Sequence, residues 1–347
     1  MAATQPPATR PAVVDSQPPA WARDLFTEPL TAHATAPDGG VLVWAAALGK
    51  SAPSRISAQF AANAEDYDGR YADAGHFQFL FQQALDATGI AIASSPSILD
   101  LGSGSGANSI IPWARITPDA RQVATDLSAE LLAILARRLR QPDSTATAVC
   151  VLMDATAYAP RAEAFDLVTG SAILHHLVRP ADGLAAAARA LKPGGHAIFL
   201  EPFMGYALLR LAFERILVEA DLRASPLDPV LARALTALNA DIAVRSAPDI
   251  TSPAFADLDD KWLFSRARIE KAARNAGFTD AAFVPHNDHP SLYRDTALVQ
   301  IRLATGRDDL VPPPWAMDIL DGFDAAMPLQ AKRELMLEGS IVLTKAR

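Results

Sequence analysis

The stretch Ile98-Leu-Asp-Leu-Gly-Ser-Gly-Ser-Gly-Ala-Asn108 decides the fold of this chain. It begins with apolar residues, turns on three alternating glycines and continues into a sequence that favours a helix. Glycines allow backbone dihedrals that other residues avoid, and they let a ligand approach the backbone closely. The helix N-terminus that follows presents free N–H groups to a bound polar group. The stretch therefore predicts a buried strand, a tight loop and a helix start, as in a nucleotide-type α/β domain.

Strands and helices alternate on the C-terminal side of this loop. Short apolar runs that end at polar or glycine residues predict five strands, at 97–101, 122–125, 147–153, 165–169 and 196–200. Helical patterns lie between them. Such alternation is typical of parallel strands joined by right-handed crossovers. We therefore predict an α/β fold with a doubly wound sheet, in which ligands bind at the carboxyl ends of the strands.

Composition and pattern divide the chain into four predicted regions. These are a proline-rich tail or linker, partly disordered (1–55), a core (56–202), a helical insertion over the rim of the sheet (203–262), and the rest of the core with a second insertion at 290–338 (263–347). The tail is predicted because seven prolines among residues 1–37 interrupt regular structure. Whether the apolar run 40–48 adds a strand stays open.

Charge and cysteine content restrict the function classes. The chain has 347 residues and a net charge of −8, which disfavours an extended nucleic-acid-binding face. Its single cysteine, Cys150, lies in an apolar run and cannot form an internal disulfide, which fits a reducing cytoplasm. We find no pattern of a signal peptide and no apolar segment of about 20 residues. The sequence predicts a cytoplasmic protein without a membrane partner.

Acidic residues lie at the carboxyl ends of three of the predicted strands and indicate what the glycine loop binds. The spacing Gly102-x-Gly104-x-x-Ala107 alone also satisfies the dinucleotide fingerprint. Asp100, however, precedes the first glycine by two residues and would repel a pyrophosphate. Asp126 follows the third glycine by 20 residues, where a carboxylate can accept two ribose hydroxyls. Asp154 ends the third strand, where it can receive an exocyclic adenine amine.

With these residues, the chain resembles a class I S-adenosylmethionine-dependent methyltransferase. The matching segments are Asp100–Gly106, Ala124–Ser128, Met153–Ala155, Phe165–Leu177 and Leu191–Gly195. The last two are similar to the branch that includes ubiquinone- and menaquinone-biosynthesis methyltransferases. The resemblance implies a Rossmann-like, mostly parallel sheet of seven strands with an antiparallel last strand. It also implies S-adenosylmethionine as the cofactor.

The resemblance assigns a set of residues to the cofactor. Gly102, Ser103 and Gly104 would meet its methionine part, while Asp100 would organise the amino end. Asp126 would contact the ribose, and Leu127 would pack on the adenine. The adenine edge would meet Asp154 and Ala155, and the sulfonium would be lined by Thr169 and Gly170. Tyr67 would touch the cofactor from a helix ahead of the loop. The alternative for Tyr67 is a core aromatic residue.

Two residues are candidate general bases, His175 and Glu201, which follow or end predicted strands at the rim. The alternative for both is a structural role, and we expect His176 to pack. Three polar residues after a later strand, His286, Asp288 and His289, could form a metal or acid–base site. They lack clear further ligands, so we predict no metal.

The hypothesis is a methyltransferase that moves a methyl group to a small-molecule acceptor by in-line displacement. The departing thioether is neutral, so positioning and desolvation do most of the work. One alternative is an S-adenosylmethionine-binding accessory protein without transfer activity. A nicotinamide-dependent oxidoreductase is disfavoured by Asp100 and by the turn at 191–195. The sequence leaves open the acceptor, the methylated element and the oligomeric state, a homodimer being one alternative.

Overall fold

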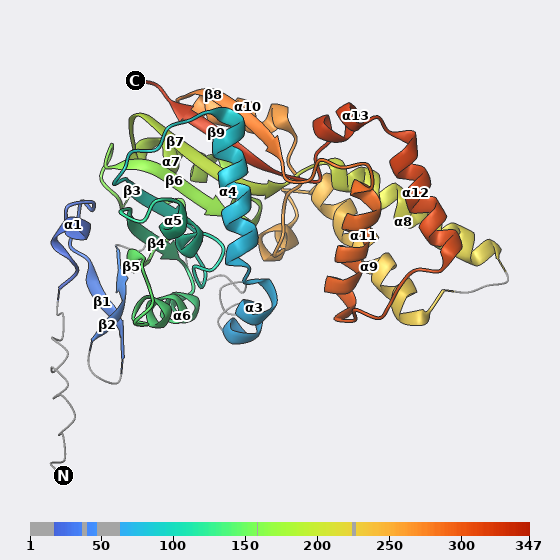
Figure 1. Cartoon of the computed structure of the whole chain (residues 1–347), viewed down its shortest axis with the longest axis horizontal. Helices are drawn as coiled ribbons and strands as arrows, with labels where there is room; N and C mark the ends of the chain where they lie inside the picture. The colour runs from blue at the N-terminus through green and yellow to red at the C-terminus, as the bar shows by residue number, and fades with distance from the viewer. Residues whose placement is uncertain (1–16, 37–39, 47–62, 158, 224–226) are drawn as a thin grey trace, which may run out of the picture.

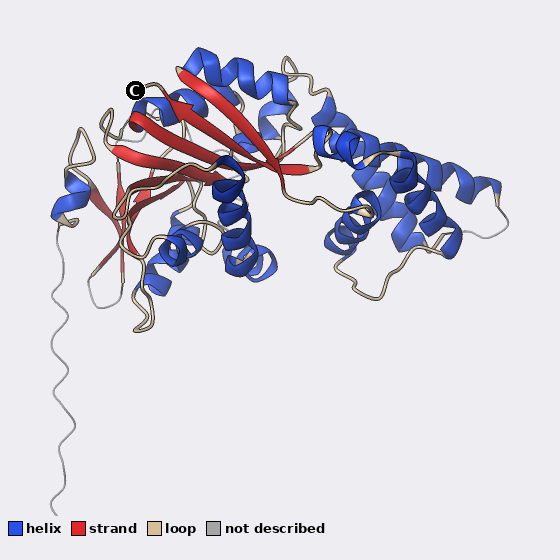
Figure 2. Ribbon diagram, turned by 45° about the horizontal axis from the view of Figure 1, so that its top comes forward, coloured by secondary structure: helices blue, strands red, loops and turns tan. Residues whose placement is uncertain are grey.

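The computed structural model describes residues 17–36, 40–46, 63–157, 159–223 and 227–347 (Figure 1). Within these residues nine strands form one sheet in the order β1-β2-β5-β4-β3-β6-β7-β9-β8. Helices cover both faces of the sheet (Figure 2). The strands are β1 (Thr31–Thr35), β2 (Val41–Ala45), β3 (Ser97–Leu101), β4 (Arg121–Asp126), β5 (Thr147–Leu152), β6 (Phe165–Ser171), β7 (Leu191–Pro202), β8 (Phe278–Pro285) and β9 (Glu338–Lys345).

Strand β3 lies in the middle of the sheet, and the order of the other strands is described from it. It pairs in parallel with β4 on one side and with β6 on the other. The chain therefore leaves β3 toward β5 first and returns to build the other half through β6 and β7. This reversal is a switch point, where open α/β sheets bind ligands beyond the carboxyl ends of their strands. The glycine loop follows β3 at this point.

Helices connect the strands and form a separate group at one end of the molecule. They are α1 (Ala20–Arg23), α3 (Ala64–Tyr71), α4 (Ala74–Thr88), α5 (Ile110–Ile116), α6 (Ala129–Leu139), η1 (Leu174–His176), α7 (Pro180–Ala190), α8 (Gly205–Leu222), α9 (Pro229–Ser246), η2 (Pro253–Asp257), α10 (Arg266–Ala276), α11 (Leu292–Thr305), α12 (Pro314–Ala326) and α13 (Leu329–Glu334). Ser128 caps α6 as its sequence indicates, because the Ser128 side chain accepts from the Leu131 N–H.

The expected α/β fold is confirmed, but the expected count of seven strands is too low by two. The extra strand β1 arises from the stretch that we predicted as a tail, and β2 arises from the run 40–48, for which an added strand was left open. β2 pairs in parallel with β5 and buries Val43 and Trp44, so it extends the sheet. The prolines around this stretch led us to predict a tail, but β1 and β2 form a short hairpin that gains its stability from tertiary packing. The remaining tail residues 1–16 and 47–55 lie outside the described residues.

Helices α8, α9, α11 and α12 form a second apolar core of their own (Figure 1). They come from the two segments that we predicted as separate insertions, and the structure packs them against each other. A buried ion pair supports this unit, since Lys332 Nζ lies 2.8 Å from Asp324 Oδ1. Asp324 also accepts from the N–H groups of Tyr293 and Arg294 at the start of α11. We call α8, α9, α11, α12 and α13 the helical unit.

Among the described residues, no helix combines the length and the apolar character that crossing a bilayer requires.

The helical unit joins the sheet at Gly205, the first residue of α8. Gly205 N–H donates to the carbonyl of Met336 at 2.9 Å. A Cβ added at Gly205 would overlap the carbonyl oxygens of Leu335 and Met336. The start of α8 therefore requires a residue without a side chain at this position.

We expect Gly205→Ala to lower the free energy of unfolding by about 1–3 kcal/mol, because the backbone at residues 335 and 336 must move to admit the methyl group. Gly322→Ala is the matched control. Gly322 lies in α12 with open space around its Cα, so alanine there should stabilise by about 0.5–1 kcal/mol. Urea denaturation measures both. Equal stability of the two variants would contradict the close contact at Gly205.

Candidate active site

The glycine loop leaves one stretch of backbone bare at the carboxyl end of β3. Gly102, Gly104 and Gly106 all have positive φ, at 70°, 51° and 76°. A Cβ on Gly102 would come within 2.6 Å of Ile173, and one on Gly106 would overlap Leu135. A Cβ on Gly104 would meet only Leu131, at 3.9 Å. Two of the glycines thus allow close packing, whereas Gly104 faces open space that a ligand can enter.

Asp126 ties this loop to the end of β4. Its carboxylate accepts from Gly104 N–H and from Ser128 N–H, both at 2.8 Å. Burial raises the pKa of Asp126, although these backbone N–H groups oppose that shift. A carboxylate offers about four lone-pair positions, so Asp126 retains acceptor capacity for further donors. Leu127, directly after it, is 44% exposed and presents an apolar surface at the rim.

Asp100 lies beneath the loop and is fully buried. Its two oxygens accept from Ser109 Oγ and Thr169 Oγ1, both at 2.6 Å. Burial raises the pKa of Asp100, and the hydroxyl donors act against it. Ser103 is similarly engaged, because its Oγ accepts from Thr125 N–H at 3.0 Å. These contacts favour an indirect role in which Asp100, Ser103 and Thr169 fix the shape of the loop.

The other predicted cofactor residues lie at the same edge. Asp154 follows β5, and its Oδ1 accepts from Thr156 N–H and Thr156 Oγ1 at 2.8 and 2.7 Å. Ala155 beside it is buried. A Cβ on Gly170 would come within 2.6 Å of Ile173, so packing accounts for that glycine. Tyr67 lies on α3, but the prediction for its side chain falls outside the described residues.

Helix α3 is fastened to the glycine loop by an ion pair. Arg138 donates to Asp68 Oδ1 at 2.8 Å and to the carbonyl of Ser105 at 3.0 Å, and Ser105 Oγ also donates to Asp68. Burial raises the pKa of Asp68, but the hydrogen bonds and charge of Arg138 outweigh it, so the pKa lies below its usual range. This contact holds α3 over the loop.

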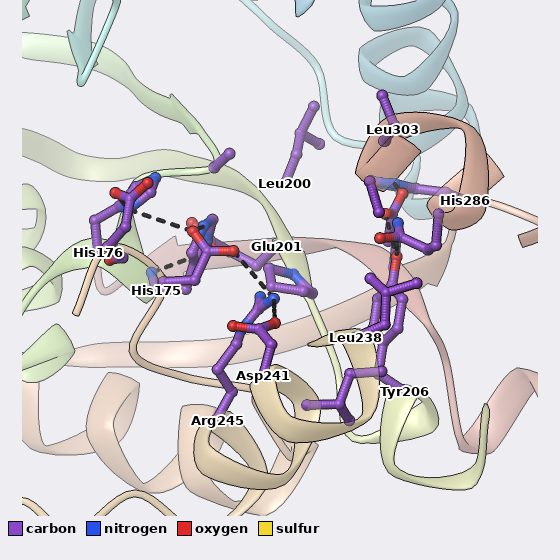
Figure 3. A pocket seen from close by; sticks show the side chains of 18 of the residues that line it. His175, His176, Leu200, Glu201, Tyr206, Leu238, Asp241, Arg245, His286 and Leu303 are labelled. Atoms are coloured by element: carbon purple, nitrogen blue, oxygen red, sulfur yellow. Dashed lines mark hydrogen bonds and ion pairs between the residues drawn. The ribbon is translucent and has the colours of Figure 1, made fainter. Parts of the chain in front are cut away.

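A cavity of about 500 Å³ lies between the sheet and the helical unit. Its walls come from α4, from the carboxyl ends of β6 and β7, and from α8, α9 and α11. Ala172, just beyond β6, lines it, so the cavity begins where the sulfonium-lining segment predicted from sequence ends. Both predicted bases, His175 and Glu201, also line it (Figure 3).

Glu201 organises the short helix η1. Its Oε1 accepts from the N–H groups of Ile173 and Leu174 at 3.0 and 2.7 Å. Its Oε2 accepts from His175 N–H at 3.3 Å and lies 2.7 Å from His175 Nδ1. Because both oxygens are occupied and the residue is only 2% exposed, these contacts favour a positioning role for Glu201.

His175 lies between two carboxylates. Its Nδ1 faces Glu201, and its Nε2 lies 3.2 Å from Asp260 Oδ1. Burial lowers the pKa of His175, but attraction by Glu201 and the hydrogen bonds to Asp260 and Glu201 outweigh it and raise the pKa to about 9. Arg245, on α9, holds the other oxygen of Asp260 at 3.0 Å and lies 3.2 Å from Asp241 (Figure 3). A chain of alternating charges thus joins the sheet to the helical unit.

The comparisons with known proteins agree with this geometry. A family model described as a methyltransferase domain matches residues 98–195. Residues 98–195 are thus similar to a methyltransferase domain. The matched range contains the motifs on which the sequence analysis based its resemblance, and the match agrees with that prediction.

Two curated proteins are similar to parts of the chain. A demethylmenaquinone methyltransferase of Clavibacter sepedonicus is 32% identical over 151 residues, which are 43% of this chain and 58% of that protein. An uncharacterized protein of Synechococcus is 34% identical over 122 residues, 35% of this chain and 29% of that protein. The chain thus spans less than two thirds of the length of either relative.

A solved structure extends the likeness beyond the matched segment. The crystal structure of the cyclase SpnF aligns with a TM-score of 0.50 at 14% identity, covering 86% of this chain and 99% of that one. At this identity the likeness shows the fold alone. The segment matched by the family model therefore lies in a chain whose overall fold has a solved counterpart.

The polar cluster predicted after β8 does not assemble next to the methyltransferase domain. Asp288 pairs with Arg333 at 2.7 Å, and His289 lies 3.7 Å from Asp295, both on the surface. Only His286 lines the cavity. The structure instead brings together His175, His176 and Asp260, whose ligand atoms lie within 4.8 Å of one another.

Sequence reasoning missed Asp260 and Arg245. Both lie in the segment predicted as a cover for the rim, where acidic and basic residues usually face solvent. The run Asp259-Asp260-Lys261 was the available signal, but its partner His175 is more than 80 residues away in the chain. Only tertiary packing makes them neighbours.

We expect His175 to titrate near pH 9 in NMR spectra of the folded protein, above its ordinary 6.5. The associated stabilisation is complete below about pH 6.5 and is lost as the pH rises through about 9. Asp260→Asn removes one of the two facing charges and should lower the pKa of His175. His196 is the internal control: burial lowers its pKa, and Asp260→Asn should leave it unchanged. A His175 pKa at or below 6.5 in the unmodified protein would contradict the charged dyad.

Proposed function

We propose that this chain transfers a methyl group from S-adenosylmethionine to a small-molecule acceptor bound in the cavity. The observation that carries the proposal is the position of the cavity. It lies between the methyltransferase domain and the helical unit, and Ala172 and His175 at the end of β6 form part of its wall. The cofactor side and the acceptor side of such a reaction would meet at this strand end.

The residues at the rim fit S-adenosylmethionine. Gly104 leaves open space beside its backbone, Asp126 keeps acceptor capacity for two ribose hydroxyls, and Leu127 offers an exposed apolar surface to the adenine. Asp154 and Ala155 would meet the adenine edge. When bound, the cofactor supplies a methyl group already activated on a sulfonium.

The protein then has to exclude water, align the acceptor and accept any proton that the acceptor loses. Helices α8, α9 and α11 wall the cavity and restrict solvent. His175 is the candidate base: Glu201 fixes its orientation through Nδ1, and Nε2 faces Asp260, which also lines the cavity. With a pKa of about 9, His175 is an imidazolium at neutral pH and must lose its proton before it can act as a base.

We further propose that segments 203–262 and 290–338 act together as the acceptor-binding cap, with 56–202 as the cofactor-binding core. The net charge of −8 supports a small molecule over a nucleic acid as partner. A cytoplasmic location is proposed from the single buried Cys150. We leave the oligomeric state to experiment.

Titration with S-adenosylhomocysteine tests the cofactor assignment. We expect Asp126→Asn to weaken binding by about tenfold or more, since hydrogen bonds to a charged acceptor contribute about 1.5–3 kcal/mol each. The surface variant Asp143→Asn is the control and should bind like the unmodified protein. Calorimetry gives both dissociation constants, and the thermal midpoints show whether the variants are folded. Unchanged affinity in folded Asp126→Asn would refute the assignment.

A further inference from the structure

A second polar cluster lies at the opposite end of the cavity from His175. It consists of Tyr206 on α8, His286 after β8, Gln300 on α11 and Glu338 at the start of β9, and we call it the far cluster. Tyr206 Oη donates to Glu338 Oε1 at 2.7 Å and receives a hydrogen bond from Gln300 Nε2 at 3.2 Å. Figure 3 shows Tyr206 and His286 together, on the other side of Leu200 from His175. The reaction proposed above does not use any of these groups.

The carboxylate of Glu338 has spare capacity that faces the cavity. Its side chain is 43% exposed, and the residue lines the cavity wall. In the part of the chain that the structure describes, neither lysine nor arginine forms an ion pair with Glu338. Tyr206 occupies Oε1 and leaves Oε2 accessible.

His286 presents an unsatisfied nitrogen at the same place. Its side chain is 5% exposed, and its Nε2 lies 3.1 Å from Ser340 Oγ. Its Nδ1 is buried and has no hydrogen-bond partner among the described residues. The nearest carboxylate oxygen, Glu338 Oε2, is 3.9 Å away, which is too long for a hydrogen bond. Leaving a buried polar atom unpaired is costly, so this atom indicates a missing ligand.

The end of the cavity near His175 is different, because its carboxylates already have cations. Asp260 faces both His175 and Arg245, and Glu201 faces His175. Apolar side chains also line the cavity, among them Leu238, Leu303 and Leu200, the last of which lies between the two ends (Figure 3). A ligand that spans the cavity would therefore need an apolar middle and a cationic group at the far cluster.

We propose that the far cluster binds an ammonium group, so that the acceptor is an amine-bearing small molecule whose charged end is held by Glu338 and His286 while its methylated atom lies near His175. This inference rests on the proposed methyl transfer and adds the class of acceptor. An ammonium has three N–H donors and no acceptor, which matches Glu338 Oε2 and the Nδ1 lone pair of His286 when Nε2 donates to Ser340. Charge-assisted hydrogen bonds of this kind are about twice as strong as neutral ones.

The test uses three probes with the same apolar chain: hexylammonium, 1-hexanol and hexanoate. Binding of each to the full chain is measured by calorimetry or ligand-observed NMR, with and without S-adenosylhomocysteine. We expect hexylammonium to bind about tenfold or more tightly than 1-hexanol, and hexanoate to bind most weakly. This comparison needs no variant and therefore does not depend on how a substitution folds.

Glu338→Gln keeps an acceptor for Tyr206 and removes the charge. We expect this substitution to weaken the binding of hexylammonium about tenfold, because the charge is lost. The affinity for 1-hexanol should change by less than about twofold. Glu270→Gln, a surface carboxylate on α10 outside the cavity wall, is the matched control and should preserve the preference for the amine.

Tighter binding of 1-hexanol or hexanoate than of hexylammonium would overturn the ammonium site, as would an amine preference that survives in folded Glu338→Gln. If the unmodified protein does not bind S-adenosylhomocysteine, that result would instead refute the proposed methyl transfer. The amine preference measured without cofactor is independent of that result, so the two failures are distinguishable.

Discussion

The contact between Glu201 and His175 is the interaction on which the site depends. Glu201 ends strand β7, and its carboxylate binds three successive backbone N–H groups of the 173–175 turn as well as the His175 ring. A strand end thereby fixes a turn, and the turn fixes an imidazole. The imidazole reaches Asp260, and Asp260 reaches Arg245 on α9. One buried carboxylate therefore begins the series of contacts that links the sheet, the turn and the helical unit.

This chain of charges is stable only as a whole. A buried carboxylate without a partner is expensive, and a histidine that is buried alone tends to lose its proton. Here each group compensates its neighbours: two carboxylates hold the proton on His175, and that imidazolium together with Arg245 keeps the pKa of Asp260 below its usual range, although burial acts to raise it. An incomplete network would destabilise the protein more than apolar residues at the same place, because removing one member leaves an unpaired charge in the cavity wall.

Local sequence rules predicted the part of the site that is made locally. The glycine loop follows β3 directly, and Asp126 follows β4, so adjacency in the sheet brings them together as parallel pairing requires. The same rules could not find Arg245 or Asp260, since nothing near them in the chain records that they meet His175. They also missed β1 and left β2 undecided, because these short strands have weak patterns and β2 gains its stability from burial against β5 and α6. In each case the sequence analysis missed a long-range contact, because local sequence patterns do not show which distant residues meet in the fold.

The division of the molecule into two apolar cores has a consequence for specificity. The proposed cofactor residues belong to loops of the sheet, whereas much of the cavity wall comes from the helical unit, whose core is separate. Substitutions within α8, α9 or α11 can therefore reshape the acceptor side without disturbing Asp126 or the glycine loop. In the proposed reaction, the sheet would hold the methyl donor and the helical unit would select the acceptor. Since the charged contact from Arg245 to Asp260 crosses this border beside His175, the proposed reaction would take place where the two cores meet.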